Sequence, residues 1–340
     1  MNLIFFGTPA YALSSLEMCL KHPDFQVLAV VTQPDKRRGR GTELIPSPVK
    51  ALAVTYNLPV LQPQRLKQDR ETLTYLRQTA VDAFVVVAYG QILSQEILDL
   101  PRLGCINAHG SLLPQYRGAA PIQWCLYDGL TTTGVTTMQM DAGMDTGPML
   151  LKGYTTIGLL DNAQDLAAKL ATLSASLLET TLLQLKAQVL NPIPQDNSQA
   201  TYAPLLQKQH YLLDWSRTAL DLHNQIRGFY PHCVAEFRGQ AVKVLATLPW
   251  HPDLPIDLAS QLPEAFLEFS PELVAMGGKA PLGSIINIVK GLGPVLQAGG
   301  GYLLLQTLQL AGKRPQTGWD FANGLRLSIG EAFGNGQQVT

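Results

Sequence analysis

The pattern of apolar residues in the first half of the chain constrains its fold more than any other feature. Short apolar runs alternate with segments of helical periodicity, and residues 83–88 (AFVVVA) are apolar at every position. A strand without polar alternation is typical of a parallel sheet that is covered by helices on both faces. We therefore expect an α/β fold built on a doubly wound, mostly parallel, Rossmann-like sheet.

The expected elements follow this alternation along the chain. Strands are expected at residues 3–6, 27–32, 60–61, 83–88, 105–109 and 135–140. Helices are expected at residues 9–20, 49–56, 70–78, 121–127 and 162–190.

The second half of the chain has a different texture. Short strand-like runs are separated by Gly and Pro, which favours a small β-barrel. The expected elements are a helix at 219–227 and strands at 234–237, 241–245, 284–289 and 302–309. The segment 249–281 is rich in Pro and acidic residues and is expected to be an insertion.

The length of 340 residues exceeds what one hydrophobic core usually serves, so two domains are expected. The segment 190–205 is rich in Pro, Asn, Gln and Ser and is predicted to be a linker. It would join a first domain, residues 1–189, to a second domain, residues 206–340.

Composition limits the possible partners. The formal net charge is -1, so any nucleic acid must be held by local basic patches. The four cysteines form no zinc-binding pattern, and we expect no metal and a reducing compartment. We also expect no membrane-spanning stretch and a soluble, cytoplasmic protein.

Three polar residues stand where a sheet of this kind binds its ligands. Asn107 and His109 are two apart on a predicted strand, so their side chains share a face. Asp145 follows the next predicted strand in a Gly-flanked loop that could cover the same sheet edge. Each residue taken alone is more often a turn former, a cap or a satisfied surface group.

The motifs around these residues carry a family resemblance. The segments NAHGSLLPQYRGAAPIQW, from residue 107, and MDAGMDTGP, from residue 140, resemble the signatures of the folate-dependent formyltransferases. The resemblance implies the formyltransferase version of the Rossmann-like fold and a catalytic trio of Asn107, His109 and Asp145. In formyl transfer to an amine, the amide stabilises an oxyanion, the imidazole moves a proton, and the carboxylate orients the imidazole.

The same resemblance implies a binding site for 10-formyltetrahydrofolate. The segment VVVAYGQIL, which ends at residue 93, resembles the pterin pocket of the family. The implied folate-binding residues are Tyr89, Gly90, Gln91, Ile92, Ser111, Leu112, Leu113, Pro114 and Asp141.

The acceptor is indicated by further motifs. The segments GTPAYALSSLE, RGAAPIQW and VTQPDKRRGRGTELIPSPVKALA resemble the branch of the family that acts on initiator methionyl-tRNA. That branch implies an OB-like C-terminal barrel that helps to hold tRNA. It also implies a monomer with no DNA or membrane partner. The implied tRNA-binding residues are Lys36, Arg37, Arg38, Arg40 and Lys313.

Three other functions remain open at this point. The same trio could serve a hydrolase that releases formate from the folate, with water in place of the amine. A relative that formylates an amino sugar nucleotide would share the first domain. A folate- or RNA-binding module without activity would also share the fold, although it has no need of an intact trio.

Overall fold

The structure is a computed structural model that describes residues 1–37, 44–268 and 280–336, and the chain divides into two compact units. The first unit comprises Met1–Pro121, Thr132–Thr155 and Ala167–Pro204. The second unit comprises Ile122–Thr131, Thr156–Leu166 and Leu205–Thr340. The predicted linker, 190–205, therefore packs almost entirely with the first unit, while two short segments from the first half of the chain join the second.

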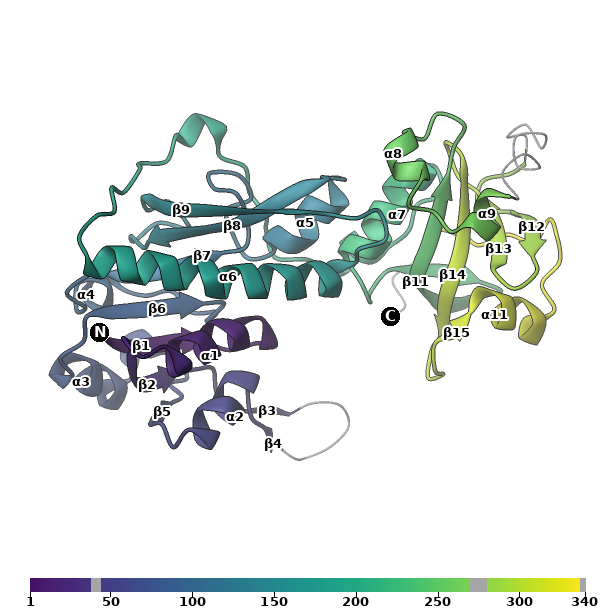
Figure 1. Cartoon of the computed structure of the whole chain (residues 1–340). Coiled ribbons are helices and arrows are strands. Elements are labelled where there is room, and N and C mark those ends of the chain that lie inside the picture. Colours follow the sequence, from purple (N-terminus) through teal and green to yellow (C-terminus); the bar gives the residue numbers. More distant parts are fainter. Residues whose placement is uncertain (38–43, 269–279, 337–340) are drawn as a thin grey trace. The chain divides into compact units, whose positions relative to one another are not determined.

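A seven-stranded sheet forms the centre of the first unit (Figure 1). Its strands, in spatial order, are β5 (Val60–Leu61), β2 (Gln26–Val31), β1 (Asn2–Gly7), β6 (Ala83–Val87), β7 (Cys105–His109), β8 (Thr132–Gln139) and β9 (Met149–Thr156). The pairs from β5 to β7 are parallel and β8 is antiparallel to β7, which confirms the mostly parallel sheet. Strand β9 was not among the expected strands.

Helices surround this sheet. They are α1 (Leu13–Lys21), α2 (Pro48–Thr55), α3 (Arg70–Gln78), α4 (Gln95–Leu98) and α6 (Ala163–Lys186), with 3-10 turns at Ala10–Ala12, Leu66–Gln68 and Asn197–Gln199. A separate two-stranded ribbon pairs β3 (Lys36–Arg37) with β4 (Leu44–Ile45). Helix α2 begins at a Ser47 cap, whose side chain accepts a hydrogen bond from Lys50 N, and has Pro48 in its first turn.

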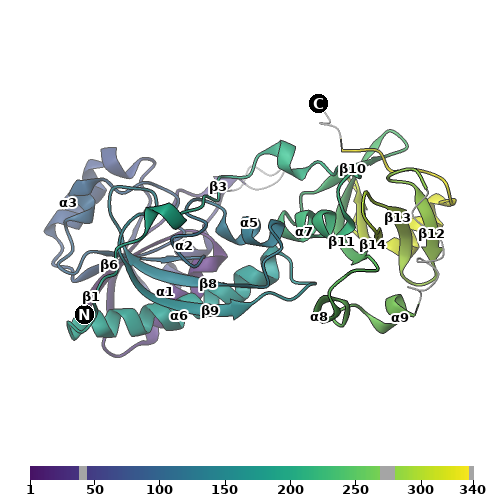
Figure 2. The same cartoon turned by 90° about the horizontal axis from the view of Figure 1, so that it is seen from above.

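The sheet buries both of its faces, as the apolar run in β6 predicts. On one face Ile4 and Phe84 pack with Leu76 of α3 and Ile97 of α4. On the other face α6 runs alongside β8 and β9 (Figures 1 and 2), and the Thr137 and Thr181 hydroxyls are 2.8 Å apart. Burial on two faces supplies the apolar contact that holds a parallel sheet together.

Helix α6 is long and apolar enough, by length and composition, to cross a membrane, whereas no such stretch was expected from the amino-acid sequence. The helix also carries a buried stripe that includes Leu170, Leu178 and Leu182, each fully buried. Its Ser174 hydroxyl lies 2.9 Å from the Tyr11 hydroxyl. In this structure α6 thus packs as a core helix of the first unit.

The second unit is built on an antiparallel sheet. Its strands, in spatial order, are β10 (Val234–Phe237), β11 (Gln240–Trp250), β14 (Tyr302–Leu310), β13 (Gly293–Gln297) and β12 (Ile285–Val289), and β15 (Gln316–Thr317) pairs with β14. Its helices are α5 (Pro121–Tyr127, of which Pro121 belongs to the first unit), α7 (Ala219–Gly228), α8 (Ile256–Ala259), α9 (Glu264–Leu267) and α11 (Gly318–Leu325), and a 3-10 turn spans Lys208–Tyr211. Strand β13 and helix α11 were not among the expected elements.

A segment near the C-terminus closes this sheet. Gly334 pairs with Glu236 of β10, and Ala332 pairs with Ser284 next to β12. The two edge strands are thereby joined through one stretch of backbone, and the aromatic ring of Phe333 is buried beneath it. A sheet whose edges are joined in this way agrees with the expected barrel.

The described part of the predicted insertion is packed rather than loose. Helices α8 and α9 come between β11 and β12 along the chain. Leu262 and Phe266 belong to a buried cluster with Leu248 of β11. The Gln261 side chain accepts a 2.7 Å hydrogen bond from Leu159 N. This segment therefore contributes a small apolar core to the second unit.

A buried histidine also contributes to the second unit. His223 of α7 is 3% exposed, and its Nε2 and Nδ1 lie 2.8 Å from Leu159 O and 2.9 Å from Thr247 Oγ1. Burial, helped by the neighbouring Arg227, lowers the pKa of His223 to about 3. The folded protein therefore holds this imidazole neutral at pH 7.

We expect Gly134→Ala to destabilise the first unit by about 1–3 kcal/mol, since overpacking of this kind forces backbone shifts. A methyl group on Gly134 would lie 1.9 Å from the carbonyl oxygen of Gly153 in β9. The control is Gly324→Ala in α11, where a Cβ meets nothing within 4 Å and should be neutral or stabilising. Urea unfolding measures both variants, and equal stability of the two would contradict this packing.

We expect the second unit to lose stability in acid because of His223. Its folded pKa of about 3 lies below the unfolded value of 6.5, so the stabilisation is complete above 6.5 and is lost as the pH falls towards 3. The expected loss is roughly 2 kcal/mol between pH 7 and pH 5. Urea unfolding of the wild type and of His223→Gln at both pH values measures it. The same pH dependence in both proteins would rule out His223 as the cause.

Candidate active site

Strand β7 carries two of the three predicted catalytic residues. It lies between β6, which is parallel to it, and β8, which is antiparallel. Cys105, at its start, packs in the core beneath α4, and Asn107 and His109 follow on the same face towards the carboxyl end. The strand therefore carries one line of side chains from the core to the sheet edge.

The imidazole of His109 is held between two oxygen atoms. His109 is 6% exposed, and its Nε2 donates a 2.9 Å hydrogen bond to the Tyr116 carbonyl, which can only accept. Its Nδ1 lies 3.6 Å from Oδ2 of Asp145. The structure thus brings His109 and Asp145 together, and the ring is oriented from both sides.

The carboxylate of Asp145 is fixed by the backbone of the loop after β7. Its Oδ2 accepts a 2.8 Å hydrogen bond from Gly118 N. Asp145 itself has a φ of 55°, a left-handed conformation that is uncommon for a residue other than Gly. The loop after β8 is therefore bent so that this carboxylate faces the end of β7.

The amide of Asn107 has unused hydrogen-bonding capacity. The residue is 9% exposed, and no hydrogen bond joins its side chain to another residue within the described ranges. A nearly buried amide that has a free donor can serve an oxygen atom of a ligand. In the β7–β8 pairing Asn107 stands opposite Met138.

A cavity of about 180 Å³ lies beside Asp145. It is lined by Gln91, Ile92, Leu93, Met138, Met140, Asp141, Ala142, Gly143, Met144 and Asp145. The loop after β6 and the loop after β8 thus face each other across one apolar space. Asp145 belongs to its wall, and Met138 connects it to Asn107.

The predicted folate-binding residues take different places around this cavity. Gln91, Ile92 and Asp141 line it, and Ile92 is 85% exposed. Ser111, Leu113 and Pro114 are buried in the loop after β7, and Leu112 is partly buried there. The Ser111 hydroxyl donates to Gln115 O at 2.6 Å and so serves the loop itself.

The loop after β6 is tied to two neighbouring loops. Tyr89 O accepts hydrogen bonds from Thr8 Oγ1 at 2.9 Å and from Gln33 Nε2 at 3.2 Å. The Tyr89 ring is buried against Phe6, and burial raises the pKa of its hydroxyl. Gly90 next to it has a φ of 86°, which suits glycine. The cavity lining includes neither Tyr89 nor Gly90. Tyr89 instead packs in the buried cluster that contains Leu93, a residue of the cavity wall.

Asp35 anchors the segment that leads into β3, which carries Lys36 and Arg37. Its carboxylate accepts hydrogen bonds from Lys50 Nζ at 2.6 Å and from Gln62 Nε2 at 2.7 Å. Both bonds lower the pKa of Asp35, with the Lys50 bond contributing most. The backbone just before Lys36 is thereby fixed to the first unit.

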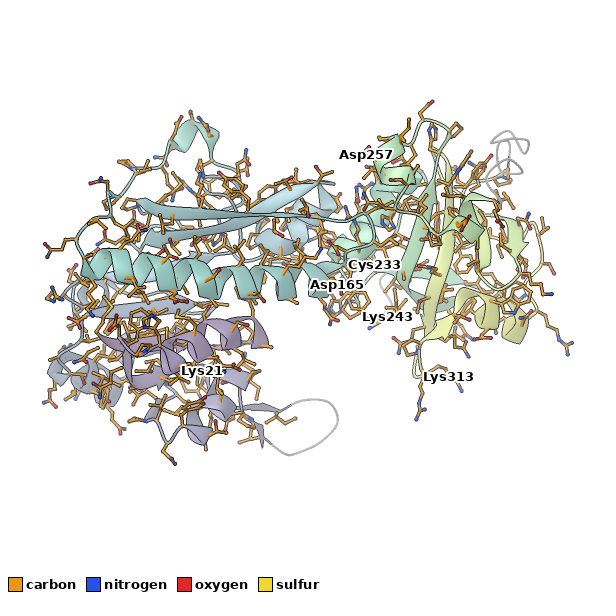
Figure 3. All side chains as sticks on the ribbon, in the orientation of Figure 1. Lys21, Asp165, Cys233, Lys243, Asp257 and Lys313 are labelled. Carbon is orange, nitrogen blue, oxygen red and sulfur yellow. The ribbon has the colours of Figure 1, made fainter. Side chains whose placement is uncertain are left out.

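Three of the five predicted tRNA-binding residues, Lys36, Arg37 and Lys313, belong to the part of the chain that the structure describes. Lys36 and Arg37 form β3, and the Lys36 side chain is exposed. Arg38 and Arg40 lie outside the described residues. In the second unit, Lys313 is exposed in the turn between β14 and β15, where Figure 3 shows it at the tip.

Met138 and Met140, which line the cavity, were not among the residues predicted to bind the folate. Met138 belongs to the apolar alternation of β8, and Met140 is the first residue of the MDAGMDTGP motif. They read as ordinary core positions, because the alternation does not show which inward side chains have a cavity beside them. Their place at the junction between β8 and this motif was the available signal.

Comparison with known proteins places these features in a family. The formyl transferase family profile matches residues 1–182, and the profile for the formyl transferase C-terminal domain matches residues 205–326. The methionyl-tRNA formyltransferase of Trichormus variabilis is 58% identical over 340 residues, which cover 99% of this chain and 100% of that protein. That of Trichodesmium erythraeum is 57% identical over 331 residues, covering 97% and 98%.

Solved structures show the same fold at low identity. WlaRD, a sugar 3N-formyl transferase crystallised in the presence of dTDP and 5-N-formyl-THF, has a TM-score of 0.61 at 18% identity and covers 92% of this chain and 99% of that one. HypX from Aquifex aeolicus, in complex with tetrahydrofolic acid, has a TM-score of 0.60 at 12% identity, covering 97% and 48%. Because the two profiles match most of its length and relatives above half identity match nearly all of it, the chain belongs to the formyl transferase family.

Proposed function

We propose that this protein transfers the formyl group of 10-formyltetrahydrofolate to the amino group of initiator methionyl-tRNA. The product would be N-formylmethionyl-tRNA, which is used to start translation. The observation that carries the proposal is that Asp145 lines an apolar cavity and lies 3.6 Å from the His109 ring, while Asn107 stands opposite Met138, another residue of the cavity wall. The acceptor is argued from relatives that match nearly the whole chain and are named for methionyl-tRNA.

The cavity suits the flat heterocycle of a folate. Ile92, Met138 and Met140 provide apolar walls, and the backbone of residues 141–145 provides polar groups at one side. Sites for small organic ligands combine these two properties. We propose that the pterin lies in this cavity and that the formyl-bearing nitrogen points towards Asn107.

The trio then supplies the chemistry of formyl transfer. The amine attacks the formyl carbon, a new N–C bond forms, and the formyl oxygen gains negative charge. The free amide of Asn107 donates to that oxygen, and this stabilises the charge as it develops. The bond between the carbon and the folate nitrogen then breaks, and the nitrogen leaves with a proton.

His109 is the group that can move this proton. Its ring stands between a carbonyl oxygen and the carboxylate of Asp145, so a second proton on the ring would face that carboxylate. Because Nε2 already donates to the Tyr116 carbonyl, Nδ1 would take a proton from the attacking nitrogen and return one to the leaving nitrogen. Asp145 would orient the ring and stabilise its charged form.

We propose that tRNA is held by local basic groups on both units. The candidates are Lys36, Arg37, Arg38, Arg40 and Lys313. Residues 206–340 contain ten Lys and Arg against ten Asp and Glu, so the second unit must act through a local patch and not through its net charge. We further propose that the protein works as a monomer in the cytoplasm, where initiator tRNA is charged.

The proposal is tested by incubating the protein with 10-formyltetrahydrofolate and three parallel acceptor conditions. These are charged initiator methionyl-tRNA, an amino sugar nucleotide, and no acceptor. Formylmethionyl-tRNA should appear in the first condition alone. Formate release without acceptor would favour the hydrolase, and formylation of the amino sugar would move the protein to that branch.

We expect Asn107→Ala to lower kcat by roughly 10²-fold or more, the usual cost of removing an oxyanion donor. The KM values should change little, since the amide acts mainly on charge that develops in the transition state. Steady-state kinetics with methionyl-tRNA measures the effect, and Asn323→Ala, an exposed change in α11, is the control. An unchanged kcat would remove Asn107 from this role.

We expect Lys36→Ala and Lys313→Ala each to weaken tRNA binding and leave the KM for the folate unchanged. A lost phosphate contact should reduce the slope of log Kd against log salt concentration by about one. Binding titrations between 50 and 300 mM salt measure this slope. Lys67→Ala, an exposed change in the 3-10 turn Leu66–Gln68, is the control. A slope equal to the wild type would exclude the residue from the tRNA surface.

A further inference from the structure

Both groups that contact the His109 ring belong to residues with left-handed backbone. Tyr116, whose carbonyl accepts from Nε2, has a φ of 58°, and Asp145, which faces Nδ1, has a φ of 55°. Such conformations are unfavourable for residues with a side chain and persist where surrounding contacts hold them. Contacts with distant parts of the chain hold these two residues.

One later segment of the chain binds both residues. The Gln195 side-chain amide donates to Asp145 O at 2.8 Å and to Gly147 O at 2.7 Å. The Thr201 hydroxyl accepts a 2.9 Å hydrogen bond from Tyr116 N. Gln195 and Thr201 thus fix, from one stretch of chain, the two residues on either side of the imidazole.

A buried arginine fixes the orientation of Gln195. Arg117 is 2% exposed, and its Nε and Nη2 donate to Gln195 Oε1 at 3.0 and 2.8 Å. Its Nη2 also donates to Asn197 Oδ1 at 2.9 Å. Because a guanidinium can only donate, Oε1 of Gln195 must face Arg117, and the amide hydrogens must face Asp145 and Gly147.

The backbone around Arg117 pairs with the same segment. Arg117 N donates to Thr201 O at 2.9 Å, and Ala203 N donates to Arg117 O at 2.7 Å. A Cβ on Gly118 would lie 2.8 Å from Ala203 O, so a glycine is required at this close approach. Gly118 is also the residue whose N–H holds the Asp145 carboxylate. The segment 195–203 therefore acts on the site through side chains and backbone together.

We infer that Gln195 and Thr201 are positioning residues of the active site. By fixing Tyr116 and Asp145, they hold the His109 ring that lies between these two residues. This inference rests on the proposed function in so far as its kinetic test uses formyl transfer to methionyl-tRNA. Neither residue needs to touch a substrate. Their effect on the reaction passes through the geometry of Tyr116, Asp145 and His109.

The kinetic test uses variants of the two positioning residues, each changed singly. Gln195→Ala and Thr201→Val should each lower kcat by roughly 10- to 100-fold, the scale expected for a displaced catalytic group, with both KM values within about twofold of the wild type. Thr201→Ser keeps the hydroxyl and should restore the rate. Gln199→Ala changes an exposed side chain of the same segment that bonds only within it, to Asp196, and should match the wild type.

A second variant of Gln195 distinguishes the loss of its hydrogen bonds from a failure of the protein to fold. Gln195→Glu keeps an acceptor for buried Arg117 but removes both hydrogen bonds that the amide donates. It should fold, as judged by an unchanged urea midpoint, and still lose at least as much kcat as Gln195→Ala. Wild-type kcat in a folded Gln195→Glu protein would overturn the inference.

A double variant of Gln195 and Asp145 tests whether Gln195 acts on the rate through Asp145 or only stabilises the fold. If Gln195 acts through Asp145, then Gln195→Ala should cost little further rate in an Asp145→Asn background. If the fold-loss of kcat in the double variant equalled the product of the losses in the two single variants, Gln195 would not act through Asp145. That result would contradict the inference. A loss that appears mainly in KM would contradict it as well.

A measurement without substrate keeps the inference testable apart from the proposed function. The ¹⁵N shifts of His109, assigned by their loss in His109→Gln, report the state of both ring nitrogens. They should move in Gln195→Ala and Thr201→Val and stay in Gln199→Ala. An inactive wild type with this pattern would refute the proposed function alone, whereas unmoved shifts would refute the positioning role even in an active enzyme.

Discussion

The pairing of β7 with a strand on each side is the constraint on which the candidate site depends. Its backbone is hydrogen-bonded to β6 and β8, so the strand can neither slide nor rotate, and a shift by one residue would turn every side chain to the other face. Cys105, anchored beneath α4, fixes that register from the core side. Asn107 and His109 then reach the carboxyl edge as a matter of strand geometry.

The remaining geometry comes from loops that are held by distant parts of the chain. Tyr116 and Asp145 adopt backbone conformations that local sequence does not favour, and both are bonded to residues some 50 to 85 positions later. A rigid strand thus provides the amide and the imidazole, while interlocked loops provide the two groups that orient the ring. The cavity lies between such loops, with Met138 as its link to the strand.

The sequence was most informative where a property repeats along the chain. The apolar run of β6 predicted a strand buried on both faces, and the spacing of Asn107 and His109 predicted their shared face, which the register of β7 bears out. It was least informative where contacts are distant. Gln195 stands in a Pro- and Asn-rich stretch that is typical of a linker, and its hydrogen bonds to Asp145 and Gly147 depend on a folded partner 48 to 50 residues away. Strand β9 and strand β13 were missed for a similar reason, because sheet neighbours and not local periodicity define them.

The division of the chain into two units affects how the gene of such a protein can recombine with the genes of its relatives. The boundaries fall after residues 121, 131, 155, 166 and 204, so the chain passes from one unit to the other five times. Neither unit is encoded by one uninterrupted stretch of gene. Recombination at a single point could exchange the C-terminal barrel strands, but it would leave Ile122–Thr131 and Thr156–Leu166 behind in their original context. A chimera that exchanges the whole second unit between diverged relatives would therefore need matched exchanges at three separate places.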